Sequence, residues 1–214
     1  MLSLLKKKWC LADVSSEKSS TLAEELNIPF SVAILLINRG VENAEEGNLY
    51  LKSDFSLLHD PFLMTGMDKA VERVIRAIEN EESITVFCDY DVDGVTSAAF
   101  LTHFFRDLNC HVSAYLPERE EEGYGLNSDA VQKIRNQGAN LMITADCGIT
   151  GVKEVAFANE LGLDVIVTDH HQVGDEGLPQ AVAVLNPHQA ECDYPFRFLS
   201  GVGLAFKLAI FLPL

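Results

Sequence analysis

Short apolar runs alternate with amphipathic segments from Ile84 to the end of the chain, and this alternation constrains the fold more than any other feature. The apolar runs have the length of buried strands, whereas the segments between them carry apolar residues at helical spacing. Strands that alternate with helices of this kind form right-handed βαβ units and a parallel sheet. The sequence therefore predicts an α/β fold with a mainly parallel sheet flanked by helices.

The elements of this fold can be placed along the chain. Strands are predicted at Ile84–Cys88, His111–Leu116, Asn140–Ala145, Asp164–Thr168 and Ala181–Leu185. Helices are predicted at Met67–Asn80, Val95–Leu108, Asn127–Gln137, Thr150–Glu160 and Gly203–Phe211. Shorter helices are predicted before them, at Ser20–Asn27, Pro29–Asn38 and Glu42–Leu51. We therefore expect a small helical N-terminal lead-in over residues 1–66 and an α/β domain over residues 67–214.

Polar side chains follow several of the predicted strands, at the point where each strand ends. Asp89, Asp91 and Asp93 follow the first strand, Asp146 follows Asn140–Ala145, and Asp169, His170 and His171 follow Asp164–Thr168. In open parallel sheets, ligands bind beyond the carboxyl ends of the strands. We expect these carboxylates and imidazoles to meet at one edge of the sheet.

Carboxylates at every second position repel one another unless a positive charge lies between them, and a divalent cation would provide it. Carboxylate oxygens favour magnesium or manganese, and added imidazoles favour manganese. The alternative is that Asp89, Asp91 and Asp93 cap a helix or lie in a solvated turn, and that Asp146 caps the helix that follows it.

Composition narrows the class of protein. A chain of 214 residues with 48% hydrophobic residues can bury a substantial core. No apolar stretch approaches the roughly 20 residues needed to span a bilayer, and Met1–Trp9 lacks the order of a secretory signal. We therefore expect a soluble cytoplasmic protein without a membrane partner. The five cysteines are scattered, which indicates reduced thiols, and we expect Cys88 and Cys147 to fill space in the core.

The formal charge of −16 argues against a general nucleic-acid-binding module, because affinity for phosphate backbones comes largely from Lys and Arg. Any affinity of this segment alone for DNA is therefore expected to be weak.

Three motifs resemble those of a known superfamily. Asp-Tyr-Asp-Val-Asp-Gly-Val-Thr-Ser at 89–97, Thr-Ala-Asp-Cys-Gly-Ile at 144–149 and Asp-His-His at 169–171 resemble the first three motifs of the DHH phosphoesterases. Four further segments, at 38–40, 58–62, 122–127 and 201–208, resemble the RecJ-type exonucleases within that superfamily, which digest single-stranded DNA from 5′ to 3′. The resemblance covers nearly the whole chain in order.

The resemblance implies a pair of Mn²⁺ or Mg²⁺ ions that hydrolyse phosphodiesters in DNA repair and recombination. By the family pattern the metal site would contain Asp89, Asp91, Asp93, Asp146 and His170, with Asp146 bridging. His171 would face the scissile phosphate, and Asp169 would orient an imidazole. Arg119 would reach a phosphate and Tyr124 would stack on a base, unless both belong to a solvated loop.

Some family features are missing from the sequence. Manganese pyrophosphatases of the superfamily have a histidine where this chain has Phe87. The fourth motif, with its own metal-binding aspartate, and the later C-terminal nuclease domains of RecJ proteins are not found before Leu214, so we expect an N-terminal catalytic portion with impaired activity. Expected partners are single-stranded DNA, single-strand-binding proteins and helicases. The alternatives are a catalytically silent metal-binding scaffold and a phosphodiesterase for short oligonucleotides or cyclic dinucleotides.

Overall fold

The computed structural model describes Cys10 and residues 12–52, 54–118, 123, 125–210 and 212. Arg119 and Tyr124, the expected substrate-binding residues, lie outside the described residues. The chain forms two compact units, Met1–Leu58 and His59–Leu214. The expected boundary at residue 66 stays a prediction. Within the second unit, Lys207 Nζ donates a hydrogen bond of 2.8 Å to the His59 carbonyl.

The first unit is helical. It contains α1 (Ser16–Leu26), α2 (Phe30–Ile37), α3 (Ala44–Leu51) and the short 3₁₀ helix η1 (Phe55–Leu57). Its small core consists of Leu22, Ala33, Leu36 and Val41. In the described part of the chain no single helix is long and apolar enough to cross a membrane, and only the bent pair α1 and α2 meets that criterion jointly.

The second unit is the predicted α/β domain. Its strands are β1 (Ile84–Cys88), β2 (Val112–Tyr115), β3 (Leu141–Ala145), β4 (Asp164–Thr168) and β5 (Ala183–Leu185). Its helices are η2 (Pro61–Leu63), α4 (Met67–Glu79), α5 (Val92–Asp107), α6 (Ser128–Asn136), α7 (Val152–Glu160) and α8 (Gly201–Ala209). The fold class and each predicted strand and helix of this unit are confirmed.

The sheet is parallel throughout, with the strand order β2-β1-β3-β4-β5. The order reverses between β1 and β3, and such a switch point is where ligands bind in open α/β sheets. Four strands end level with one another, because Cys88 pairs with Ala145, Ala145 with Thr168, and Thr168 with Leu185. The residues that follow these strands therefore leave the sheet in one row.

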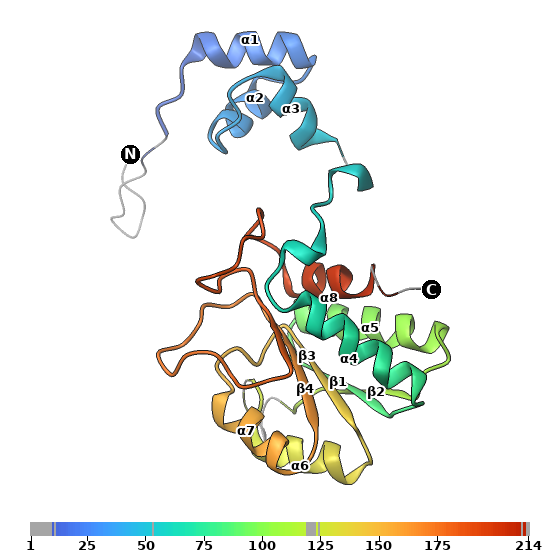
Figure 1. Ribbon diagram of the computed structural model, residues 1–214. Helices are drawn as coiled ribbons and strands as arrows, with labels where there is room; N and C mark the ends of the chain where they lie inside the picture. The colour runs from blue at the N-terminus through green and yellow to red at the C-terminus, as the bar shows by residue number, and fades with distance from the viewer. Residues whose placement is uncertain are drawn as a thin grey trace. The chain divides into compact units, whose positions relative to one another are not determined.

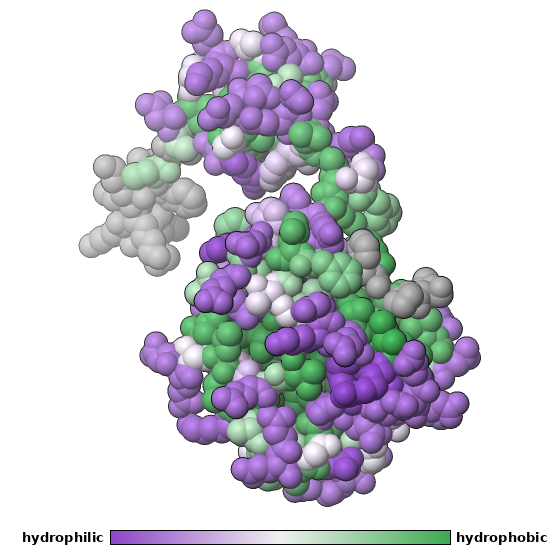
Figure 2. All heavy atoms as spheres, viewed as in Figure 1, coloured by the Kyte–Doolittle hydropathy of each residue, from purple (hydrophilic) through white to green (hydrophobic). Residues whose placement is uncertain are grey.

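Helices cover both faces of this sheet. Figure 1 shows α4, α5 and α8 on one face and α6 and α7 on the other. The first layer buries Val86, Ile143 and Ile166 against the α4, α5 and α8 side chains, and the second layer buries Met142 and Val165. β1 and β3 are buried along their whole length, as strands covered on both faces should be. In the space-filling view hydrophilic residues predominate on the visible face, with hydrophobic ones between them (Figure 2).

Two helices of the second unit begin earlier than predicted, and in each case a side chain upstream caps the helix. α5 begins at Val92 rather than Val95, because the Asp91 carboxylate accepts a hydrogen bond from Gly94 N. α8 begins at Gly201 rather than Gly203, because Ser200 Oγ accepts one from Gly203 N. The added residues of both helices lie beside the predicted site.

Candidate metal centre

The predicted site residues lie at the carboxyl ends of the three central strands, β1, β3 and β4. Because these strands end level, Asp89, Asp146 and Asp169 are the next residues of neighbouring strands. The local structure after each strand decides where each side chain points.

After β1 the chain turns sharply into α5. Asp89 is fully buried and its Oδ1 accepts a hydrogen bond of 2.7 Å from Tyr90 N. Gly94 allows the turn, since an added Cβ would lie 2.3 Å from the Asp89 carbonyl oxygen. Asp91 Oδ1 accepts from Gly94 N at 2.9 Å, so the alternative role of helix cap is confirmed for Asp91. The capping hydrogen bond uses one lone pair of the carboxylate, and the remaining lone pairs leave Asp91 able to bind a metal as well.

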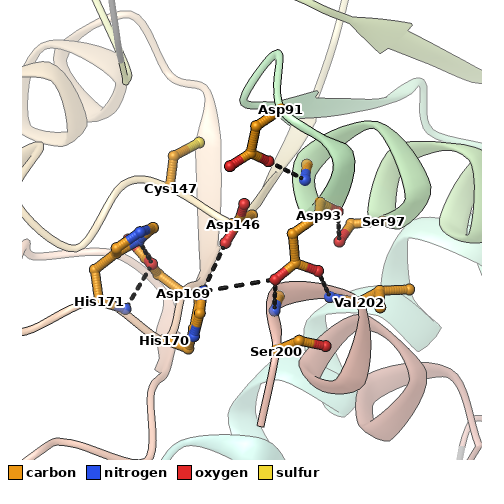
Figure 3. Close-up of polar contacts among 12 residues, drawn as sticks. Asp91, Asp93, Ser97, Asp146, Cys147, Asp169, His170, His171, Ser200 and Val202 are labelled. Atoms are coloured by element: carbon orange, nitrogen blue, oxygen red, sulfur yellow. Dashed lines mark hydrogen bonds and ion pairs between the residues drawn. The ribbon is translucent and has the colours of Figure 1, made fainter. Parts of the chain in front are cut away.

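Asp93 is on the first turn of α5, and both of its carboxylate oxygens are held by the start of α8. Oδ2 accepts a hydrogen bond of 2.6 Å from Gly201 N, and Oδ1 accepts one of 2.8 Å from Val202 N. His170 Nε2 lies 3.6 Å from Oδ2 on the other side. Figure 3 shows Asp93 between His170 and the start of α8.

Asp146 follows β3 in a left-handed conformation, with φ of 63°. Non-glycine residues rarely adopt this conformation, and Asp is among those that tolerate it. Its side chain is 1% exposed, and Oδ1 accepts no hydrogen bond but faces His170 Nε2 at 3.0 Å. Burial and the nearby Asp93 and Asp91 carboxylates raise the pKa of Asp146 to about 8.

The alternative that Asp146 caps the next helix is excluded. α7 begins at Val152, its N-cap is Gly151, and no side chain caps it. The turn that separates Asp146 from α7 depends on Thr144, whose hydroxyl donates a hydrogen bond of 2.7 Å to the Cys147 carbonyl. A buried carboxyl group without a capping role at this position is typical of a ligand site.

After β4, Asp169 holds the turn that carries the two histidines. Its Oδ2 accepts from Ile149 N at 2.9 Å, while Oδ1 accepts from His171 N at 3.0 Å and lies 2.6 Å from His171 Nδ1. Asn186, the residue after β5, donates a hydrogen bond of 2.9 Å to the His171 carbonyl. Partial burial lowers the pKa of His171, but the carboxylates of Asp169, Asp146 and Asp89 together outweigh it, so the pKa lies above its ordinary value.

The donor atoms of Asp146, His170 and His171 lie within 4.8 Å of one another, close enough to hold one metal ion. Figure 3 shows that the side chains of Asp91, the residue before α5, and Asp93, on its first turn, reach the same space. Oxygen and imidazole donors around a buried carboxylate oxygen that accepts no hydrogen bond suit manganese or magnesium. These residues therefore fit a divalent metal.

The structure brings most of the predicted site residues together. Those that converge are Asp91, Asp93, Asp146, Asp169, His170 and His171. Asp89 is buried beside them, near enough to raise the pKa of His171. Their assignment as metal ligands and catalytic groups stays a prediction. Cys88 and Cys147 are buried free thiols, and burial raises the pKa of Cys88 to about 12. The expectation that both cysteines fill space in the core is therefore confirmed.

Two contributions were not predicted from the sequence. The backbone at Gly201 and Val202 binds Asp93, and Asn186 holds the turn of the histidines. Both had a signal: Ser200 is a typical N-cap residue, and Asn186 follows an apolar run as the site aspartates do.

Known proteins match this chain over most of its length. The DHH family, N-terminal domain, matches residues 83–212. The single-stranded-DNA-specific exonuclease RecJ of Bacillus subtilis (strain 168) is 45% identical over 204 residues, which are 95% of this chain and 26% of that protein. RecJ of Escherichia coli (strain K12) is 40% identical over 177 residues, covering 82% of this chain and 30% of that protein. The chain thus spans less than a third of these relatives.

Solved structures agree with these matches. A crystal structure of exonuclease RecJ bound to manganese has a TM-score of 0.64 and 34% identity, and covers 70% of this chain and 37% of that chain. RecJ from Thermus thermophilus in complex with Mn²⁺ has a TM-score of 0.71 and 26% identity, and covers 94% of this chain and 28% of that chain. With the family match over residues 83–212 and the site geometry described above, the chain belongs to the DHH family.

Proposed function

We propose that this chain carries the metal centre of a RecJ-type exonuclease, which hydrolyses phosphodiester bonds of single-stranded DNA from the 5′ end. The observation that carries the proposal is the convergence of Asp91, Asp93, Asp146, His170 and His171 at the switch point of the sheet. The relatives supply the substrate, because they are named single-stranded-DNA-specific exonucleases. The manganese complexes of two similar structures support the choice of metal.

The metal ligands in this proposal are Asp91, Asp93, Asp146 and His170, with Asp146 shared between two ions and Asp89 near them. The position of Asp146 supports its role as a ligand shared by two ions, since its carboxyl group is buried and lies next to both Asp93 and Asp91. When bound, two divalent cations would lower the pKa of an attacking water and stabilise the phosphate oxygens. The acidic cluster favours such a charge, because its ionised carboxylates repel one another.

His171 acts on the substrate rather than on the metal in this proposal. Asp169 lies 2.6 Å from Nδ1, which fixes the ring and directs Nε2 away from Asp169. An imidazole with a raised pKa can donate a hydrogen bond to a phosphate oxygen or a proton to the leaving oxygen. Asp169 is then a positioning residue, because it acts through His171.

The direct test measures metal binding and hydrolysis separately. Calorimetric titration of the chain with Mn²⁺ reports the metal site, and release of mononucleotides from 5′-phosphorylated single strands reports the reaction. The same measurements on a chimera, in which this chain replaces the matching segment of the Bacillus subtilis relative, test the segment in a longer protein. Asp146→Ala should abolish both signals, whereas Asp175→Asn, at an exposed position, should preserve them.

The outcomes separate the proposal from its alternatives. Mononucleotide release from long single strands, with duplex DNA resistant, supports the exonuclease. Cleavage of dinucleotides or cyclic dinucleotides alone would indicate a small-substrate phosphodiesterase. Mn²⁺ binding without hydrolysis in both the chain and the chimera would indicate a metal-binding scaffold and refute the proposed reaction.

A further inference from the structure

The first turn of α8 contacts two acidic residues from different elements, Asp93 on the first turn of α5 and Asp146 directly after β3. Gly201 N and Val202 N each donate a hydrogen bond to a different oxygen of Asp93, at 2.6 Å and 2.8 Å. The paired contacts fix both the position and the plane of the Asp93 carboxylate. Each oxygen accepts one N–H, and a carboxylate oxygen can accept more than one contact. The start of a helix also carries partial positive charge, which favours the anion.

The second acidic residue, Asp146, packs against Gly201 at the position where any other residue would have its Cβ. A Cβ at position 201 would lie 2.6 Å from Asp146 Cβ, 2.7 Å from its Oδ1 and 2.8 Å from its Cγ. Real Cβ atoms do not approach other heavy atoms this closely, so Asp146 or α8 would have to move. The requirement for glycine is steric, because Gly201 is not among the residues with positive φ.

Neither side of this contact can move easily. α8 is anchored in the core through Leu204, Ala205 and Leu208, which are buried with the side chains of α5 and the sheet. Asp146 is 1% exposed, and its backbone N–H donates to the Thr168 carbonyl at 3.0 Å. A group added at residue 201 would therefore act on the positions of Asp146 and Asp93 together.

We propose that Gly201 is a positioning residue of the metal centre, where its N–H holds Asp93 and its missing side chain admits Asp146 at the distance that a shared metal requires. The inference rests on the metal site of the proposed function. The start of α8 thereby sets the spacing between Asp93 on the first turn of α5 and Asp146 directly after β3.

The test compares two glycines in the same helical turn. Gly201→Ala places a methyl group against Asp146, whereas Gly203→Ala meets only ordinary contacts, the nearest being Leu199 Cδ2 at 3.4 Å. Gly201→Ala should weaken Mn²⁺ binding by about 10- to 100-fold, the usual cost of disturbing groups that orient metal ligands. Gly203→Ala should bind Mn²⁺ as the unmodified chain does. Calorimetric titration with Mn²⁺ measures both.

A second measurement needs no metal and locates the strain. In EDTA, Gly201→Ala should lower the Tm, and the loss should largely disappear when Asp146→Gly removes the side chain that the methyl group meets. Glycine also tolerates the positive φ at this position. Should Gly201→Ala alone fail to fold, recovery of a folded protein in the double variant would support the same contact.

The failures can be told apart. If the unmodified chain binds no Mn²⁺, the metal site of the proposed function is wrong. If that chain binds Mn²⁺ and Gly201→Ala binds it equally well, the positioning role is wrong. An equal Tm loss, or an equal failure to fold, with and without the Asp146 side chain would also overturn the inference.

Discussion

Replacing Asp146 by Asn should stabilise the metal-free protein while it removes metal binding. The Asp146 carboxyl group is buried beside Asp93 and Asp91, and these surroundings raise its pKa to about 8 from an ordinary value of 3.8. Asn has the same shape, carries no charge at any pH and tolerates a left-handed conformation. It therefore avoids the cost of protonating or ionising a buried acid.

The magnitude follows from the raised pKa. Keeping the carboxyl group protonated at pH 7, about three pH units above its ordinary pKa, costs about 4 kcal/mol at most, because each unit corresponds to about 1.4 kcal/mol. Relaxation of the site reduces this cost, so we expect Asp146→Asn to gain about 2–4 kcal/mol in free energy of unfolding at pH 7. The gain must depend on pH, because Asn does not titrate.

The direction of the pH dependence is fixed by the raised pKa. The folded state of the unmodified protein binds the Asp146 proton more tightly than the unfolded state, so its contribution to stability is complete below the ordinary pKa of 3.8 and is lost as the pH rises through about 8. The stability difference between Asp146→Asn and the unmodified chain should therefore be near zero at about pH 4 and largest at about pH 8.

Urea unfolding in EDTA, followed by circular dichroism across this pH range, measures the difference. The exposed Asp175→Asn is the matched control and should show no comparable gain. Adding Mn²⁺ should stabilise the unmodified chain and leave Asp146→Asn unchanged. If Asp146→Asn is less stable than the unmodified chain at pH 8 in EDTA, or if the difference does not vary with pH, the reasoning from the buried carboxyl group is wrong.

Other predictions concern the remaining parts of the site and its support. His171→Ala should lower hydrolysis in the chimera at least about 100-fold but change the Mn²⁺ affinity, measured by calorimetry, little. An equal loss of hydrolysis and of Mn²⁺ affinity would make His171 a ligand. Mn²⁺ affinity should rise with pH, by up to about tenfold per pH unit below pH 8, because Mn²⁺ binding displaces the Asp146 proton. Calorimetric titration in buffers of different ionisation enthalpy counts the protons released. Binding without proton release would contradict the raised pKa of Asp146. Arg73, which is 4% exposed and pairs with Glu82 and Asp164, should cost about 2–3 kcal/mol of stability when replaced by Ala, whereas Arg76→Ala should cost under about 1 kcal/mol; urea unfolding compares the two, and equal costs would show that burial of Arg73 is unimportant.

Much of the second unit could be predicted from the sequence because its signals are local. β1 and β4 have the predicted bounds, since each is an apolar run that ends abruptly at an aspartate. The convergence of Asp146 with the histidines after β4 followed from one general rule, that parallel strands end at the same edge of the sheet. The rule places these residues at one edge, and the pairing of β3 with β4 brings them into contact.

Contacts between distant segments could not be predicted in the same way. The hydrogen bonds from Gly201 N and Val202 N to Asp93 join residues about a hundred positions apart, and they depend on how α8 packs on α5. The left-handed conformation of Asp146 also leaves no mark in the sequence, because Asp occurs in many turns. The one sequence sign of the first contact is Ser200, a typical N-cap residue before α8.

The strand order has a consequence for how the site can fail. The three strands that end at the site, β1, β3 and β4, are each hydrogen-bonded to a neighbour on both sides, while the sheet edges are β2 and β5. Edge strands fray at low cost, whereas an interior strand opens only when much of the sheet does. Local unfolding will therefore reach the Asn186 end of β5, and with it the hydrogen bond to the His171 carbonyl, before it disturbs the spacing of the carboxylates, which will persist until the α/β unit itself melts.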